Sequence, residues 1–124
     1  MKQIYGAEPF YFNKENVILK KIKSIIYSKQ LSSGKYVNKF EQNFSKVVNT
    51  SYSIAVSSGG TALEVALEAL NIKGKDVLVP TQTFIATANA VIRAGGNPIF
   101  CDIEKNGGCL DPKDIIKKIT KKTA

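Results

Sequence analysis

The sequence of 124 residues contains no histidine and only two cysteines, Cys101 and Cys109. Two thiols without an imidazole are too few soft ligands for a zinc site, and nothing in an intracellular protein favours joining them in a disulfide. The lack of histidine also excludes the Ser-His and Cys-His pairs that activate many catalytic nucleophiles. We therefore expect no metal centre and no nucleophile activated in this way.

Long apolar runs and clusters of arginine are missing as well. No run approaches the roughly 20 apolar residues of a helix that spans a bilayer. The first residues contain no apolar signal-peptide segment, so we expect a cytoplasmic protein. The net charge of +8 comes almost entirely from lysine, because Arg93 is the only arginine. Lysines scattered along the chain are typical of solvated helix faces and not of a nucleic-acid interface, although the basic balance favours an anionic substrate.

What the chain does contain is an alternation of helical and strand patterns. Apolar residues at helical spacing predict amphipathic helices over about 14–30 and 36–48. Beyond them, short buried strands alternate with helices: strands at 54–56, 76–80 and 98–102, and helices at about 62–70, at 84–93 and from 112 onward. Connections of this length join parallel strands by right-handed crossovers. The predicted fold class is therefore α/β, with helices on both faces of a mainly parallel sheet.

The turn Ser57-Ser58-Gly59-Gly60-Thr61, between the first predicted strand and its helix, is the strongest candidate site. The first N–H groups of a helix have no internal partner, and the peptide dipoles leave about half a positive charge at this end, so a phosphate binds well there. Glycine lets the anion approach the backbone closely. A plainer interpretation is that Ser58 or Thr61 only caps the helix. Five small residues in succession favour phosphate binding, because a cap needs only one of them.

Five motifs, in this order and at this spacing, resemble one family. They are Leu31-Ser-Ser-Gly34 with Phe40-Glu41 and Phe44, then Ala55-Val-Ser-Ser-Gly59, residues 74–80, Thr83-Phe84-Ile-Ala-Thr87 and Asn97-Pro-Ile-Phe-Cys-Asp102. Together they resemble the N-terminal third of sugar aminotransferases of the DegT/StrS type, which are fold-type I enzymes that use pyridoxal phosphate. The resemblance extends from about residue 8 to the end of the chain.

The resemblance implies a helical segment over residues 1–50, followed over 51–124 by the first part of the α/β domain that binds pyridoxal 5'-phosphate. It implies a homodimer that transfers an amino group from glutamate to a keto group of a nucleotide-linked sugar, in polysaccharide or amino-sugar biosynthesis. In such enzymes the cofactor supplies the electron sink and the protein supplies orientation and charge.

In this family a Ser-Gly-Thr turn binds the cofactor phosphate, and an aromatic residue stacks on the pyridine ring. The resemblance carries these roles to Ser58, Gly59, Gly60 and Thr61, and to Phe84. Gly60 stands where the threonine is usual, and Thr61 follows one position later, so the hydroxyl that reaches the phosphate stays open. The alternative for Phe84 is a core position at the start of a helix. The end of a strand in an open α/β sheet, where ligands lie, favours stacking.

The family's Schiff-base lysine, and the carboxylate that meets the pyridine nitrogen, belong to motifs that this sequence does not contain. Lys73 and Lys75 are nearest to the motifs, but both lie in a hydrophilic turn, and we assign neither as catalytic. The chain is therefore expected to be an N-terminal fragment that is inactive by itself. Two alternatives stay open: a non-catalytic module that binds a phosphate ligand, and a structural remnant whose turn is only a cap.

Overall fold

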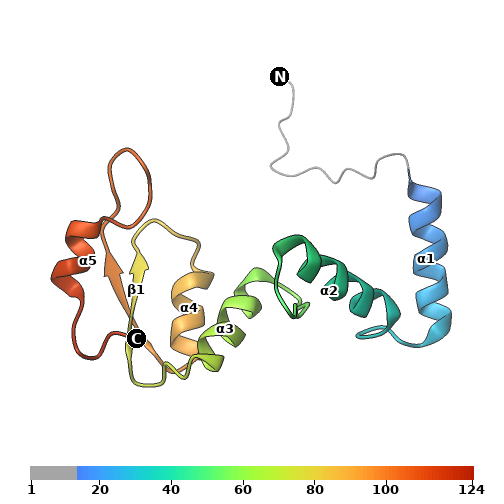
Figure 1. Ribbon diagram of the computed structural model, residues 1–124, viewed down its shortest axis with the longest axis horizontal. Coiled ribbons are helices and arrows are strands. Elements are labelled where there is room, and N and C mark those ends of the chain that lie inside the picture. Colours follow the sequence, from blue (N-terminus) through green and yellow to red (C-terminus); the bar gives the residue numbers. More distant parts are fainter. Residues whose placement is uncertain (1–13) are drawn as a thin grey trace. The chain divides into compact units, whose positions relative to one another are not determined.

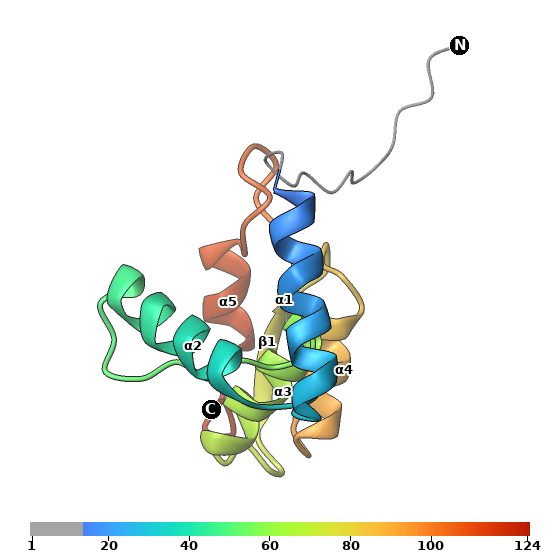
Figure 2. The ribbon, with the colours of Figure 1, turned by 90° about the vertical axis from the view of Figure 1, so that its right-hand side faces the viewer.

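The computed structural model describes residues 14–124, which belong to two compact units, Met1–Ala55 and Val56–Ala124. Figure 1 labels the helices and strands, and Figure 2 shows the same ribbon from the side. The candidate turn and both strands lie in the second unit, so this unit contains the candidate site.

Two helices make up most of the described part of the first unit, α1 (Glu15–Ser28) and α2 (Lys35–Val48). They confirm the two amphipathic helices that the apolar spacing predicts. Each helix is followed by a residue in the left-handed conformation, Lys29 with φ of 60° and Asn49 with φ of 54°, which turns the chain out of the helix. Neither helix contains a fully buried residue. Their apolar stripes are therefore largely in contact with solvent.

The second unit alternates helices and strands in the order α3, β1, α4, β2 and α5. Their bounds are Gly59–Ala69, Asp76–Pro80, Ala86–Arg93, Asn97–Cys101 and Pro112–Lys118. The two strands pair in parallel, with Asp76 opposite Asn97 and Pro80 opposite Cys101. α4 and α5 lie on opposite sides of this sheet in both views (Figures 1 and 2). The α/β class, with helices on both faces of a parallel sheet, is therefore confirmed.

The core of the second unit lies where α4 covers the sheet. It consists of four side chains that are at most 4% exposed: Ile72, Val79, Ala88 and Val91. Val79 comes from β1, Ala88 and Val91 come from α4, and Ile72 lies in the connection before β1. α4 packs on both strands, and α3 packs on α4. The buried apolar surface therefore holds α4 against the sheet, and α4 provides the surface on which α3 packs.

Gly96 is the tightest point of this core. A Cβ added there would lie 2.7 Å from Cδ1 of Ile72 and 3.1 Å from Cγ1 of Val91, and both distances are shorter than ordinary van der Waals contact. The N–H of Gly96 donates to the Val91 carbonyl at 2.9 Å, and the N–H of Asn97 donates to the Lys75 carbonyl at 2.8 Å. Glycine at this position therefore lets the chain pass directly from α4 into β2.

The strand predicted at 54–56 is not formed. The N–H of Ala55 donates to Oε1 of Glu41 at 2.8 Å, and the Ile54 side chain is 77% exposed. An apolar run predicts burial, but a strand also needs a neighbouring strand to pair its backbone groups. Among the described residues the sheet therefore has two strands in place of the expected three, and the βαβαβα order lacks its first strand.

A cluster of charged groups attaches α5 to the end of β2. Oδ2 of Asp114 accepts a hydrogen bond from the N–H of Asp102 at 2.7 Å and lies 2.8 Å from Nζ of Lys118. Nζ of Lys118 also donates to the Phe100 carbonyl at 2.7 Å. The Asp102 N–H and then the Lys118 ammonium lower the pKa of Asp114, while the hydrogen bond to Asp114 raises the pKa of Lys118. α5 is therefore held by charge-assisted hydrogen bonds, which are stronger than neutral ones.

None of the described helices combines the length and the apolar character that crossing a membrane requires. Over residues 14–124 there is also no group of three or more histidine, cysteine, aspartate or glutamate side chains arranged to hold a metal ion.

We expect Gly96→Ala to lower the free energy of unfolding by about 1–3 kcal/mol, as is typical when an extra methyl group is forced into a packed core. Urea denaturation followed by circular dichroism measures this loss. Gly59→Ala is the matched control, because a Cβ at Gly59 meets no atom within 4 Å and alanine favours a helix more than glycine does. Equal unfolding free energies for the wild type and Gly96→Ala would mean that the close contact is relieved at no cost.

We expect the hydrogen bond and ion pair of Asp114 to stabilise the folded state at neutral pH, and this stabilisation to be lost in acid. Because the folded-state pKa of Asp114 is lowered, the contribution is complete above the unfolded-state value of about 3.9 and disappears as the pH falls through the folded-state value. Asp114→Asn keeps an acceptor for the Asp102 N–H but removes the charge. Its melting temperature should therefore lie below that of the wild type at neutral pH, and the difference should close in acid.

Thermal melts at several pH values measure the difference between the two proteins. Glu104→Gln, which removes an exposed carboxylate of the preceding loop, is the control and should show no such convergence. A difference between Asp114→Asn and the wild type that is constant with pH would contradict the assignment.

Candidate functional site

Ser58 is the N-cap of α3. Its backbone is extended, with φ of −158° and ψ of 162°, and its Oγ accepts a hydrogen bond from the N–H of Thr61 at 3.2 Å. The same Oγ lies 3.0 Å from Oγ1 of Thr61, and Oγ of Ser57 lies 3.4 Å from that Oγ1. The capping role that the sequence offers for Ser58 is therefore confirmed, and the hydroxyls of the turn bind one another.

Gly59 and Gly60 are the first residues of α3, and their N–H groups donate to no acceptor among residues 14–124. The first N–H groups of a helix have no partner within it. A Cβ at Gly59 would meet no atom within 4 Å. The positive end of α3 therefore presents free donors next to open space, which is the arrangement that binds a phosphate.

Gly60 has a different environment from its neighbour. A Cβ at Gly60 would lie 3.4 Å from Cβ of Ala86, the first residue of α4. α3 and α4 pack against each other, and Gly60 faces Ala86 across this contact. Substitutions at the two glycines therefore test different properties of the turn.

A cavity of about 220 Å³ lies beside the turn, between α3 and α4. Its lining comes from both helices: Ser58, Gly60, Thr61 and Glu64 on the α3 side, and Ala86, Asn89, Ala90 and Arg93 on the α4 side. A guanidinium nitrogen of Arg93 lies 3.6 Å from a carboxylate oxygen of Glu64. Asn89 and Arg93 are absent from the candidates predicted from the sequence. Their spacing of three and seven residues from Ala86 is the signal that could have placed them on one helix face.

Phe84 lies between the end of β1 and the start of α4, and its side chain is 78% exposed. The alternative core position for this aromatic residue is therefore wrong. The hydroxyls of Thr83 and Thr87 lie 2.9 Å apart and hold the chain around Phe84 while the ring stays free. An exposed ring that follows the carboxyl end of a parallel strand is suited to stacking on a planar ligand.

The structure brings the predicted site residues to one end of the second unit. The approach of Gly60 to Ala86 places the turn beside the segment that contains Phe84, because Ala86 follows Phe84 by two residues. Ser58, Gly60 and Thr61 share the cavity between the helices, whereas Gly59 and Phe84 lie outside it. The turn therefore has two sides, an inner side that packs on α4 and an open side at Gly59.

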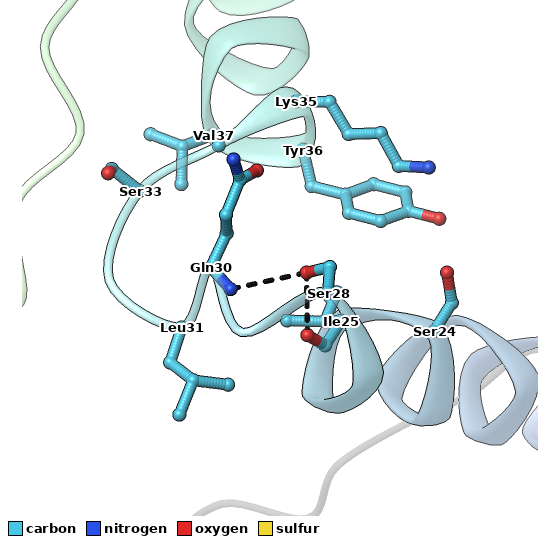
Figure 3. A pocket seen from close by; sticks show the side chains of 10 residues that line it. Ser24, Ile25, Ser28, Gln30, Leu31, Ser33, Lys35, Tyr36 and Val37 are labelled. Carbon is cyan, nitrogen blue, oxygen red and sulfur yellow. Dashed lines mark hydrogen bonds between the residues drawn. The ribbon is translucent and has the colours of Figure 1, made fainter.

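Another cavity, of about 310 Å³, lies in the first unit where α1 leads into α2 (Figure 3). Its polar lining consists of the hydroxyls of Ser24, Ser28, Ser33 and Tyr36, the Gln30 amide and the Lys35 ammonium. Oγ of Ser28 donates to the Ile25 carbonyl at 2.7 Å and accepts from the N–H of Gln30 at 3.3 Å. These bonds serve the end of α1. None of the predicted site residues lines this cavity, and the candidate site is therefore the turn of the second unit.

Comparison with known proteins identifies one family. Residues 13–124 match the family model described as the DegT/DnrJ/EryC1/StrS aminotransferase family, which is the family that the sequence motifs resemble. The chain is 43% identical over 93 residues to a GDP-perosamine synthase of Escherichia coli O157:H7, a match that covers 74% of this chain and 26% of the relative. It is 38% identical over 104 residues to a 3-oxo-glucose-6-phosphate:glutamate aminotransferase of Bacillus subtilis, a match that covers 83% of this chain and 24% of the relative. The chain spans about a quarter of the length of the curated relatives that it matches.

Solved structures match the same region. An aminotransferase of Psychrobacter cryohalolentis matches with a TM-score of 0.82 and 29% identity, over 97% of this chain and 30% of that chain. The Bacillus subtilis protein NtdA, solved with bound cofactor PMP, matches with a TM-score of 0.80 and 30% identity, over 98% of this chain and 30% of that chain. These likenesses confirm the α/β fold that the resemblance implies.

We expect Ser58→Ala to lower the free energy of unfolding by about 1 kcal/mol, the usual effect of removing an N-cap side chain. Ser57→Ala is the matched control, because Oγ of Ser57 approaches only as close as 3.4 Å to Oγ1 of Thr61. Urea unfolding of both variants measures the effect. Equal losses in the two variants would show that the bond from the Thr61 N–H to Ser58 contributes nothing specific.

Proposed function

This chain belongs to the DegT/DnrJ/EryC1/StrS aminotransferase family, and from this membership we propose that it supplies the phosphate-binding turn of a sugar aminotransferase that depends on pyridoxal 5'-phosphate. The observation that carries the proposal is the pair of N–H groups at Gly59 and Gly60 that donate to no acceptor among the described residues, with open space at Gly59. Residues 51–124 are then the first part of the cofactor-binding domain. The helical segment proposed over residues 1–50 precedes it, and its residues 1–13 lie outside the described part of the chain.

The phosphate is bound by the backbone at the start of α3. Gly59 and Gly60 donate their N–H groups to it, and the dipole of α3 adds about 0.3–1 kcal/mol of favourable interaction. Ser58 does not need to bind the phosphate to serve the site, because its bond to the Thr61 N–H holds the first turn of the helix in shape. Oγ1 of Thr61, 3.0 Å from Oγ of Ser58, is a further donor at the same end.

Phe84 would hold the pyridine ring of the cofactor by stacking. An aromatic pair of this kind contributes about 0.5–1.5 kcal/mol beyond the area that it buries. The exposure of Phe84 means that its ring is available for this contact without a change in the core. The cofactor, when bound, supplies the electron sink for amino transfer. The residues of this chain bind and orient it, and we assign none of its lysines to the covalent link.

The substrates that we propose are glutamate as the amino donor and a keto sugar linked to a nucleotide as the acceptor. The supporting observations are the names of the relatives, a GDP-perosamine synthase and a 3-oxo-glucose-6-phosphate:glutamate aminotransferase. The net charge of +8 suits an anionic sugar derivative, because a positive field raises its local concentration. A homodimer is part of the same proposal and has its support in the family resemblance. A cytoplasmic location is proposed with it from the sequence composition.

We expect Gly59→Asp to weaken binding of pyridoxal 5'-phosphate by at least about 100-fold, the equivalent of about 3 kcal/mol. The Cβ of the new side chain would meet no neighbouring atom within 4 Å, and a carboxylate suits the positive end of the helix, so the fold should be kept. It competes with the phosphate for the same N–H groups and repels it. Absorbance of the bound cofactor and amino transfer from glutamate to a keto-sugar nucleotide, both in the protein expressed from its whole reading frame, are the measurements.

Gly59→Ala is the matched control and should weaken cofactor binding much less than Gly59→Asp, because it adds a methyl group at the same position without a charge. Unchanged cofactor absorbance in Gly59→Asp would place the phosphate elsewhere and defeat the assignment. Cofactor binding by the wild type without any amino transfer would favour the alternative of a non-catalytic binding module.

A further inference from the structure

The loop over residues 103–110, between β2 and α5, contains the only asparagine of the sequence that precedes a glycine, Asn106-Gly107. The two ends of the loop are joined by an antiparallel bridge between Ile103 and Leu110. Within it, the N–H of Glu104 donates to the Cys109 carbonyl at 2.9 Å. Asn106 and Gly107 lie between these joined ends and are both exposed.

We propose that Asn106 is a site of spontaneous modification, at which the asparagine is converted to aspartate and to β-linked isoaspartate. In the first step the backbone nitrogen of Gly107 attacks Cγ of Asn106. A carbon–nitrogen bond forms, the proton of the Gly107 N–H goes to solvent, and the side-chain nitrogen takes up a proton and leaves as ammonia. In the second step water adds to one of the two carbonyls of the five-membered imide and opens the ring. The reaction consumes only water.

The surroundings of Gly107 leave its backbone nitrogen available for this attack. The Gly107 N–H donates to no acceptor among the described residues, and neither Asn106 nor Gly107 lies in a helix or strand. Glycine has no Cβ to keep the Asn106 side chain away from the following nitrogen. Gly108, with φ of 65°, follows in the turn, and its N–H donates to the Glu104 carbonyl at 3.2 Å. The bond that closes the turn therefore leaves the Gly107 nitrogen unused.

Other asparagines of the second unit lack these conditions. Asn97 precedes Pro98, which has no N–H, and Asn71 precedes Ile72, which is β-branched and only 2% exposed. Asn89 lies within α4, where the backbone N–H groups are held in helical hydrogen bonds. The inference is therefore specific to Asn106.

The modification would change both the charge and the length of the loop. A carboxylate would replace the amide beside Glu104, whose Oε2 lies 3.1 Å from the Cβ position at Gly107, and the two negative groups would repel each other. The β-linkage adds a backbone methylene between Ile103 and Leu110. The loop leaves the carboxyl end of β2, the edge at which Phe84 follows the parallel strand β1. An effect on cofactor affinity would rest on the proposed function, whereas the modification itself does not.

The test is incubation of the purified protein in mildly alkaline buffer at body temperature, followed by digestion and mass spectrometry. The peptide that contains Asn106 should gain one mass unit and separate into two products, one of which is labelled by an isoaspartate methyltransferase. A synthetic peptide that spans residues 103–110 sets the reference rate, and the folded protein should convert at a similar rate. Gly107→Ala is the matched variant and should slow the conversion strongly, because a Cβ hinders the attack.

An Asn106 peptide that keeps its mass while the synthetic peptide converts would overturn the proposal, since it would show that the folded loop protects the amide. Conversion at the other asparagines at the same rate as at Asn106 would overturn its specificity. Both outcomes can be read from the mass spectra alone, so failure here is distinguishable from failure of the proposed aminotransferase function.

Discussion

The second unit depends on the absence of a side chain at Gly96. Ile72 and Val91 leave no room for a Cβ at this residue, and its N–H is bound to the Val91 carbonyl at the end of α4. The next residue, Asn97, begins β2 and donates its N–H to the Lys75 carbonyl, directly before β1. The parallel register that pairs Asp76 with Asn97 follows from this link. The packing of the core and the hydrogen bonds at the start of β2 therefore both require a small residue at position 96.

The same packing determines where the candidate site lies. Ala88 and Val91 hold α4 over the strands because both are buried. The first residue of α4, Ala86, approaches Gly60 and so positions the N-terminus of α3 at the end of the unit where the chain leaves β1. Ligand sites of open α/β sheets lie at this edge. The apolar core thus places the polar donors of α3 beside the segment that contains Phe84, although none of the core residues belongs to the site.

Most of the elements are predictable from the sequence because their signals are local. The strand predicted at 76–80 is β1, Asp76–Pro80. The last helix begins at residue 112 as predicted, and its N-cap Asp111 accepts from the N–H of Lys113 at 2.9 Å. The prediction fails at 54–56, where the apolar run is real but no neighbouring strand pairs with it. Pairing is a property of distant residues, and an apolar run contains no information about it.

The turn was predictable as a candidate site, but the separate roles of its residues were not. Small residues at the start of a helix indicate an anion site wherever they occur. The difference between Gly59, which faces open space, and Gly60, which faces Ala86, depends on how α4 packs on α3. Asn89 and Arg93 were missed for the same reason, because they reach the cavity only through that packing.

The turn has its hydroxyls and its free backbone donors on different residues. A Cβ at residue 60 would lie 3.4 Å from Cβ of Ala86, an ordinary van der Waals distance. The hydroxyls belong to Ser57, Ser58 and Thr61, and Oγ1 of Thr61 lies 3.0 Å from Oγ of Ser58. The backbone donors do not depend on which residue carries the hydroxyl. The free N–H groups of Gly59 and Gly60 therefore stay at the N-terminus of α3 while the hydroxyls of the turn bind one another.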